Sequence, residues 1–219
     1  MYFLLHPISS LNHLIARIIT DQITFLTSIG LFIFIALNYK NHFWQSVDNE
    51  VSEWSLNSRD TFLKARSYDL AICGNAIFHI VFSIIFSIIV FLVKHRISYV
   101  IDVLFVLIFS WGLNRLLKIV FKRERPVNLA TGIRKRLSYC FPSGHIMASI
   151  SIYFFSAFIL QNIISFLPWY IIALFISFFV VMSRIYLNHH YFTDVLGGIC
   201  MGVFCLNISV WFYFFNSLL

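Results

Sequence analysis

The sequence predicts an all-α membrane protein whose helices form a polytopic bundle. Three observations support this: 60% of the 219 residues are hydrophobic, only 11% are charged, and the apolar residues gather in six long runs. A soluble domain averages about 45–50% apolar and about 25% charged residues, so this composition excludes an ordinary soluble fold. The chain shows neither an internal repeat nor a low-complexity linker, and we expect a single domain over residues 1–219.

Each apolar run is long enough to cross the hydrocarbon core of a bilayer, which takes about 20 residues in an α-helix. Polar or charged residues bound every run, as expected of a chain that crosses a membrane repeatedly. The six predicted transmembrane helices are Gln22–Tyr39, Leu70–Val93, Ile97–Leu117, Ile146–Phe166, Trp169–Leu187 and Phe192–Phe215.

Two segments outside these spans are predicted to lie on the membrane surface. Met1–Asp21 carries apolar residues at helical spacing with polar residues opposite, a pattern typical of an interfacial N-terminal helix. Asn41–Asp69, a surface helical segment between the first two spans, places apolar residues among acids at near-helical spacing. Trp44 and Trp54 within it suit the headgroup layer, where tryptophan is enriched.

The formal net charge of +7 indicates contact with anionic lipid or a phosphorylated substrate. It does not indicate nucleic-acid binding, because the lysines and arginines lie between the apolar spans and not along one helix. The four cysteines show no metal-ligand spacing and no disulfide framework. We expect no cofactor, and no metal, because fixed cations can do the electrostatic work and only one acid, Glu124, lies near them; the sequence implies no obligate protein partner.

Two polar loops are predicted to meet at one face of the membrane. Lys118–Phe141 follows the third span and Arg184–Tyr191 follows the fifth, so two crossings separate them and they must emerge on the same side. His145 opens the fourth span and Asp194 opens the sixth, which brings both side chains to that same face. Polar residues that are remote in the sequence can therefore form one site.

The first of three stretches with chemical character reads "KIVFKRERP". Lys118, Lys122 and Arg125 lie at positions i, i+4 and i+7, so a continuing helix would place them on one face. Arginine's planar fork binds phosphate oxygens through two hydrogen bonds, and lysine adds a point charge. This pattern predicts an anion site.

The other two stretches read "PSGH" and "SRIYLNHHYFTD". Ser143 is a good N-cap for the fourth span, and the amides of Gly144 and His145 would then point outward at the positive end of the helix, where anions bind. His190 and Asp194 are four residues apart, one helical turn. A carboxylate at that spacing can hold the imidazole Nδ1–H and leave Nε2 available as a nucleophile.

Together these stretches resemble the type-2 phosphatidic acid phosphatase (PAP2) superfamily, whose pattern is K-x6-RP, then PSGH, then SR-x5-H-x3-D. Every fixed position is filled in order between Lys118 and Asp194, and the six-span layout extends the resemblance over most of the chain. The resemblance implies that His190 is a nucleophile that becomes phosphohistidine and that Asp194 orients it. His145 would protonate the leaving oxygen and then activate water. The residues that would hold the phosphoryl oxygens, without a metal, are Lys118, Arg125, Ser143, Gly144 and Arg184.

His189 is the obvious rival of His190, but His190 has the spacing of the family pattern. Asn114 and Arg115, one turn before Lys118, are weaker candidates for residues that support the site.

Lys122, Arg123 and the triplet Arg134, Lys135 and Arg136 lie outside the family pattern. One interpretation is a solvated or lipid-facing run of charge. The other is a second anionic pocket, which would suit a diphosphate or a multiply phosphorylated head group.

The leading hypothesis for function is a membrane hydrolase of lipid metabolism. It would remove a phosphate or diphosphate from a bacterial cell-envelope lipid: a polyprenyl diphosphate, phosphatidylglycerol phosphate, phosphatidic acid or a lipid A phosphate. One alternative is a lipid phosphotransferase that uses the same phosphohistidine, and another is a non-catalytic phospholipid carrier. The vanadate haloperoxidases share the motif set, but they are soluble, and six predicted spans argue against them.

The orientation of the site is predicted differently by two arguments. Twelve lysines and arginines lie on the side of the site and three on the opposite side, so the positive-inside rule places the site in the cytoplasm. The family resemblance implies a bacterial inner membrane with the site facing the periplasm. Discounting Lys118, Arg125 and Arg184 as catalytic still leaves nine cations against three, and we follow the family resemblance in expecting the periplasm.

Overall fold

The computed structural model describes the backbone of residues 7–58, 61–126, 139–164 and 166–218, and all regular structure in those ranges is helical. Side chains are described for residues 22–58, 65–126, 139–164 and 166–217. The elements are α1 (Pro7–Asn38), α2 (His42–Asn57), α3 (Thr61–Ala71), the short 3-10 helix η1 (Ile72–Gly74), α4 (Ala76–Lys94), α5 (Ser98–Phe121), α6 (Gly144–Ile163), α7 (Trp169–Tyr186) and α8 (Phe192–Leu218).

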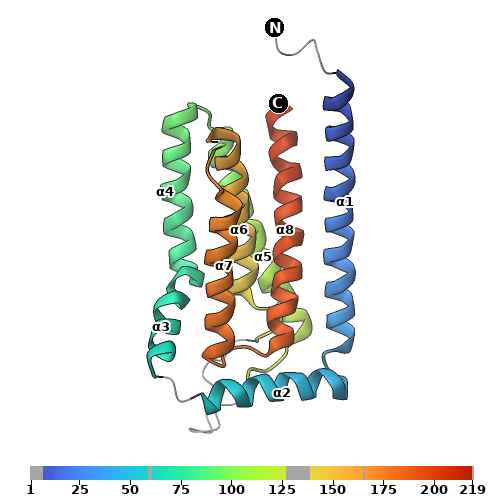
Figure 1. The fold of residues 1–219 in the computed structure, drawn as a ribbon, viewed down its shortest axis with the longest axis vertical. Helices are drawn as coiled ribbons and strands as arrows, with labels where there is room; N and C mark the ends of the chain where they lie inside the picture. The colour runs from blue at the N-terminus through green and yellow to red at the C-terminus, as the bar shows by residue number, and fades with distance from the viewer. Residues whose placement is uncertain (1–6, 59–60, 127–138, 165, 219) are drawn as a thin grey trace.

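Five helices, α4 to α8, are long and apolar enough to cross a membrane. Within the part of the chain whose side chains are described, Gln22–Asn38 of α1 passes the same test together with α2, and the chain bends by 92° between them. Helix α2 lies across one end of the bundle, whereas α1 runs beside α8 (Figure 1). With α1 as the sixth span, the predicted all-α membrane bundle is confirmed, and α2 and α3 form the helical segment predicted between the first two spans.

Helix α6 is the centre of the bundle and packs against α5, α7 and α8. Its side chains Ile152, Phe155 and Ile159 are buried with Val103 and Val106 of α5. Large apolar side chains on the outer faces of α4 and α7 remain exposed, as expected where a helix meets lipid. The residues at the ends of α6 are therefore held by three neighbouring helices.

The N-terminal segment differs from the prediction of a separate interfacial helix. The backbone of Pro7–Asn38 forms one continuous helix of 32 residues, and Figure 1 shows no bend along it. No proline or glycine interrupts the sequence between Pro7 and Gly30, so nothing in the backbone favours a break near Asp21.

The second span also differs, because it begins at Ala76 and not at Leu70. The residues before it form η1, and Asn75 is extended with φ −76° and ψ 150°. A Cβ on Gly74 would lie 2.7 Å from Val180 Cγ1 and 3.5 Å from His145 Cβ. Only glycine allows the chain to pass this close, and the break places Ala71–Asn75 against the start of α6.

Glycines on α8 allow it to approach α6 closely. A Cβ on Gly202 would lie 2.8 Å from Ile150 Cβ and 3.0 Å from the backbone oxygen of Met147. A Cβ on Gly198 would lie 2.8 Å from the backbone oxygen of Ser143. Backbone atoms cannot move aside as a flexible side chain can, so these contacts fix the distance between the two helices.

We expect Gly202→Ala to destabilise the protein by about 1–3 kcal/mol, the usual cost of overpacking a close contact. The measurement is the midpoint of thermal unfolding in detergent. Gly112→Ala is the matched control, because a Cβ on Gly112, also in a transmembrane helix, has no neighbour within 4 Å. An equal loss in both variants would contradict the close-packing explanation.

Candidate active site

The predicted convergence of the polar loops is confirmed. The C-terminus of α5, the N-terminus of α6 and the loop between α7 and α8 meet at the end of the bundle that α2 crosses (Figure 1). The Ser143 amide donates to the Asp194 carbonyl at 3.0 Å, which joins the start of α6 to the start of α8. The rings of His145 and His190 lie 6.4 Å apart between centroids.

His190 is buried, with 3% of its surface exposed, and both ring nitrogens face charged groups. Nδ1 lies 3.5 Å from Asp194 Oδ2, and Nε2 accepts a hydrogen bond from Arg125 Nη1 at 3.2 Å. This arrangement fits a neutral imidazole with its proton on Nδ1. Nδ1 faces Asp194 as predicted but has no hydrogen-bond partner among the described residues, and Nε2 is occupied by Arg125.

Burial lowers the pKa of His190 well below its ordinary value, and the cationic groups of Arg125, Lys118 and Arg184 lower it further. Both causes disfavour the imidazolium form. The ring is therefore neutral at pH 7, which is the state that a nucleophilic histidine requires.

Arg125 reaches the site by a route that differs from the prediction. Helix α5 ends at Phe121 because Lys122 is left-handed, with φ 47°. In the segment that follows, the Arg123 carbonyl accepts a hydrogen bond from the Cys140 amide at 2.8 Å. Arg125 therefore does not share a helix face with Lys118, and its Nη1 also donates to the His189 carbonyl at 2.7 Å.

Arg184 is the third predicted cation and is 2% exposed at the end of α7. Its Nη2 donates to the Ala71 carbonyl at 2.7 Å, so the segment before α4 positions it. A Cβ on Gly74 would lie 3.6 Å from the same nitrogen. The interrupted start of the second span thus helps to hold a site residue in place.

Ser143 occupies the N-cap position of α6 as predicted, but its side chain makes no capping hydrogen bond. Its Oγ is buried and has no hydrogen-bond partner among the side chains that the structure describes. Gly144 packs against α5, because a Cβ there would lie 2.5 Å from Asn114 Oδ1. The Asn114 amide in turn donates to the Pro142 carbonyl at 3.1 Å, so Asn114 supports this turn.

A cavity of about 260 Å³ opens beside these groups, between α4, α5 and the start of α6. Three predicted site residues line it: Lys118, Gly144 and His145. The other lining residues are Gly74, Ala76, His79, Trp111, Asn114 and Arg115. The eight predicted site residues therefore lie together at one end of the bundle, next to a space for a ligand.

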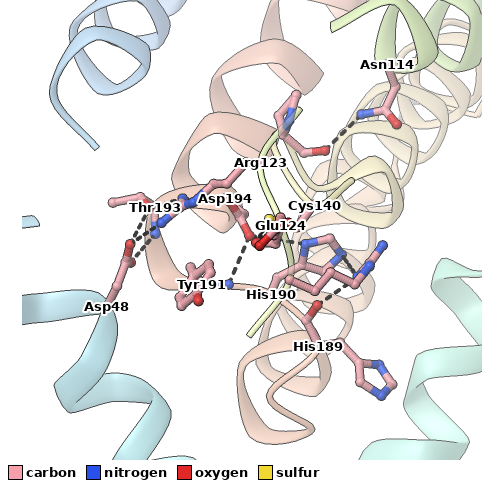
Figure 2. Close-up of polar contacts among 12 residues, drawn as sticks. Asp48, Asn114, Arg123, Glu124, Cys140, His189, His190, Tyr191, Thr193 and Asp194 are labelled. Atoms are coloured by element: carbon pink, nitrogen blue, oxygen red, sulfur yellow. Dashed lines mark hydrogen bonds and ion pairs between the residues drawn. The ribbon is translucent and has the colours of Figure 1, made fainter. Parts of the chain in front are cut away.

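Two residues that sequence reasoning missed are Asp48 and Thr193, which join α2 to the site through Arg123 (Figure 2). Arg123 was predicted to be solvated, to face lipid or to bind a second anion. Instead, Arg123 Nη1 lies 2.7 Å from Asp194 Oδ1 and 2.6 Å from Thr193 Oγ1, and Nη2 lies 2.6 Å from Asp48 Oδ2. Asp48 also accepts from the Thr193 amide at 2.9 Å.

The Arg123 guanidinium is enclosed as well as paired. Its side chain is 11% exposed, and its Cζ lies 4.5 Å from the ring centroid of Tyr39 and 4.3 Å from that of Tyr191. Asp194, in the first turn of α8, therefore has Arg123 as an ion-pair partner, and His190 lies on its other side. In the sequence, the one feature that could have indicated this contact is an acid, Asp48, within an amphipathic segment.

The triplet Arg134, Lys135 and Arg136 lies outside the described residues. Among the side chains that are described, no group of three or more histidines, cysteines or acids has the geometry of a metal site.

The family model described as the PAP2 superfamily matches residues 99–218, more than half of the chain. The chain belongs to this superfamily, and the resemblance of the three motifs is thereby confirmed.

Two relatives from Bacillus subtilis are similar to this chain. Phosphatidylglycerophosphatase B of strain 168 is 38% identical over 108 residues, which are 46% of this chain and 52% of the relative. The matched part thus spans about half the length of that curated relative. The crystal structure of a transmembrane PAP2-type phosphatidylglycerolphosphate phosphatase superposes with a TM-score of 0.78 at 27% identity, over 85% of this chain and 94% of that one. The fold and the apolar helices establish an integral membrane protein.

Proposed function

We propose that this protein is a membrane phosphatase that hydrolyses a terminal phosphate from a lipid through a phosphohistidine on His190. The observation that supports this best is the placement of His190. Its Nε2 lies 3.2 Å from Arg125, its Nδ1 faces Asp194 and its ring is 6.4 Å from His145. A nucleophile, its orienting carboxylate, an anion-binding cation and an acid–base group are thus adjacent.

In the first step, His190 Nε2 attacks phosphorus as the bond from phosphorus to the leaving oxygen breaks. His145 donates a proton to that oxygen, and Asp194 stabilises the positive charge on the His190 ring. In the second step, His145 removes a proton from water, which attacks the phosphohistidine and releases inorganic phosphate. Arg125 must transfer its hydrogen bond from Nε2 to a phosphoryl oxygen when the substrate binds.

Charge that develops on the phosphoryl oxygens is stabilised by groups already fixed in the site. Lys118, Arg125 and Arg184 supply three positive charges, and the last two are buried. Ser143 Oγ and the Gly144 amide supply neutral donors at the N-terminus of α6. Fixed donors in a site that excludes water need little reorganisation during the reaction, so we propose that the chemistry needs no metal.

We propose phosphatidylglycerol phosphate as the first substrate to assay, because both relatives are named for that activity. Polyprenyl diphosphates, phosphatidic acid and lipid A phosphates are the other members of the panel. We favour a phosphatase over a carrier because His190 is neutral and lies next to His145. Phosphate binding alone would not require these two histidines to be adjacent.

The purified chain in a non-ionic detergent should release inorganic phosphate from phosphatidylglycerol phosphate in the presence of EDTA. Vanadate, which mimics the trigonal phosphoryl group, should inhibit the reaction. Turnover only when an acceptor lipid is added would assign the protein as a phosphotransferase. Lipid binding without turnover on any lipid of the panel would assign it as a carrier.

We further propose that the site faces the periplasm from a bacterial inner membrane. Glu50 is exposed on α2, at the site end, and Lys94 is exposed at the far end of α4. In spheroplasts, a membrane-impermeant thiol reagent should label Glu50→Cys and spare Lys94→Cys. The reverse pattern would place the site in the cytoplasm.

A further inference from the structure

Arg115 lines the cavity beside the active site, although it belongs to no motif. It lies on α5 three residues before Lys118, so the two side chains are neighbours on one face of the helix. Lys118, Gly144 and His145 line the same cavity. A cation inside a transmembrane helix is costly unless it has a function or reaches the headgroups, so its presence here requires an explanation.

The cavity lies on the leaving-group side of the reaction. In phosphoryl transfer the attacking atom, the phosphorus and the leaving oxygen lie roughly in line. His190 attacks from one side, and His145, which protonates the leaving oxygen, must therefore face the other. His145 lines the cavity and His190 does not, so the alcohol or phosphate that leaves occupies this space.

The size of the cavity indicates which part of a lipid it holds. Sites that enclose a whole drug-sized ligand measure about 300–1,000 Å³. This cavity measures about 260 Å³, so it fits a head group, and the acyl chains would remain in the bilayer. A charged residue in its wall therefore contacts the part of the substrate next to the cleaved bond.

Arg115 is available for a ligand in this cavity in a way that Arg123 and Lys122 are not. Its side chain is exposed and makes no hydrogen bond or ion pair within the part of the chain that the structure describes. Arg123, by contrast, is occupied by two buried carboxylates. Lys122 is exposed beyond the end of α5 and does not line the cavity.

We infer that Arg115 binds a second phosphoryl group, carried by the leaving group, and so makes lipids with two phosphoryl groups the preferred substrates. This inference rests on the proposed phosphatase function. The second group is the phosphodiester in phosphatidylglycerol phosphate and the retained phosphate in a polyprenyl diphosphate. Phosphatidic acid lacks it, because its leaving group is a neutral diacylglycerol. Arg115 is thus a specificity-determining residue.

The test compares kcat/KM of the wild type and Arg115→Gln on phosphatidylglycerol phosphate, on farnesyl diphosphate and on phosphatidic acid, all in the same detergent. A hydrogen bond to a charged group contributes about 1.5–3 kcal/mol. The ratio of kcat/KM for each doubly phosphorylated lipid to that for phosphatidic acid should therefore fall roughly 10-fold to 100-fold in the variant. A fall for one lipid alone would identify which second phosphate Arg115 binds.

Lys94→Gln is the matched control, because it removes one exposed positive charge at the far end of α4. It should leave both ratios unchanged. Equal losses of Arg115→Gln on every lipid, or no loss on any, would overturn the inference; the second result would mean that Arg115 only reaches lipid headgroups. A wild type that hydrolyses none of the lipids would instead overturn the proposed function.

Discussion

Replacing His190 with alanine should reduce kcat on the preferred lipid by roughly 10⁴-fold or more, because the proposed attacking atom is lost. The ring is buried and contacts Arg125 and Asp194, so the variant must first be shown to unfold in detergent at the same temperature as the wild type. Lipid binding should persist, since Lys118, Arg125 and Arg184 remain. Phosphate release under single-turnover conditions is the measurement.

The adjacent histidine provides the matched control. His189 contacts Arg125 through its backbone carbonyl, which His189→Ala keeps, so this variant should retain most of the activity. Rapid quenching of the wild type with ³²P-labelled lipid should trap a protein-bound phosphate that is stable to base and labile to acid, and His190→Ala should lack it. A trapped phosphate in His190→Ala, or a comparable loss in His189→Ala, would assign the nucleophile to another residue.

The convergence of the site residues could be predicted from the sequence because it follows from the number of membrane crossings between them. An even number of crossings separates Lys118 from Arg184, so both must lie at one face whatever the packing of the helices. The four-residue spacing of His190 and Asp194 similarly constrains them to one turn, although the helix begins only at Phe192. Apolar run length and charged boundaries then gave most spans to within a few residues.

The contacts that could not be predicted join residues far apart in the sequence without a repeating pattern. Asp48 meets Thr193 across 145 positions, and nothing in the amphipathic pattern of α2 distinguishes this acid from its exposed neighbours. The left-handed backbone of Lys122 ends α5, so Arg123 points toward Asp48 and Asp194 and Arg125 does not continue the helix face of Lys118. A lysine in the sequence gives no indication of that conformation. Such features depend on tertiary packing, which single-sequence propensities do not contain.

Arg123→Gln should lower kcat by roughly 10²-fold and also destabilise the fold. Removing one partner of a buried ion pair leaves an uncompensated charge and costs about 3–5 kcal/mol. Here two carboxylates, Asp48 and Asp194, lose their common cation. Without it Asp194 no longer keeps a fixed, ionised carboxylate toward His190, so the nucleophile loses its orientation. KM should change little, because the three cations proposed to bind phosphate are untouched.

A second variant separates positioning of Asp194 from mere stability. In Arg123→Gln with Asp48→Asn, the unpaired charge on α2 is gone and only Asp194 stays unpaired, so the melting temperature should recover part of its loss while kcat remains low. Lys122→Gln is the control for charge, since it removes one exposed cation from the adjacent position and should change kcat less than about twofold, as is usual for exposed charges. If kcat recovers together with stability, Arg123 only holds α2 in place. If KM rises while kcat is kept, Arg123 contacts the substrate. A low kcat with restored stability and normal KM would identify Arg123 as the residue that positions Asp194, and through it His190.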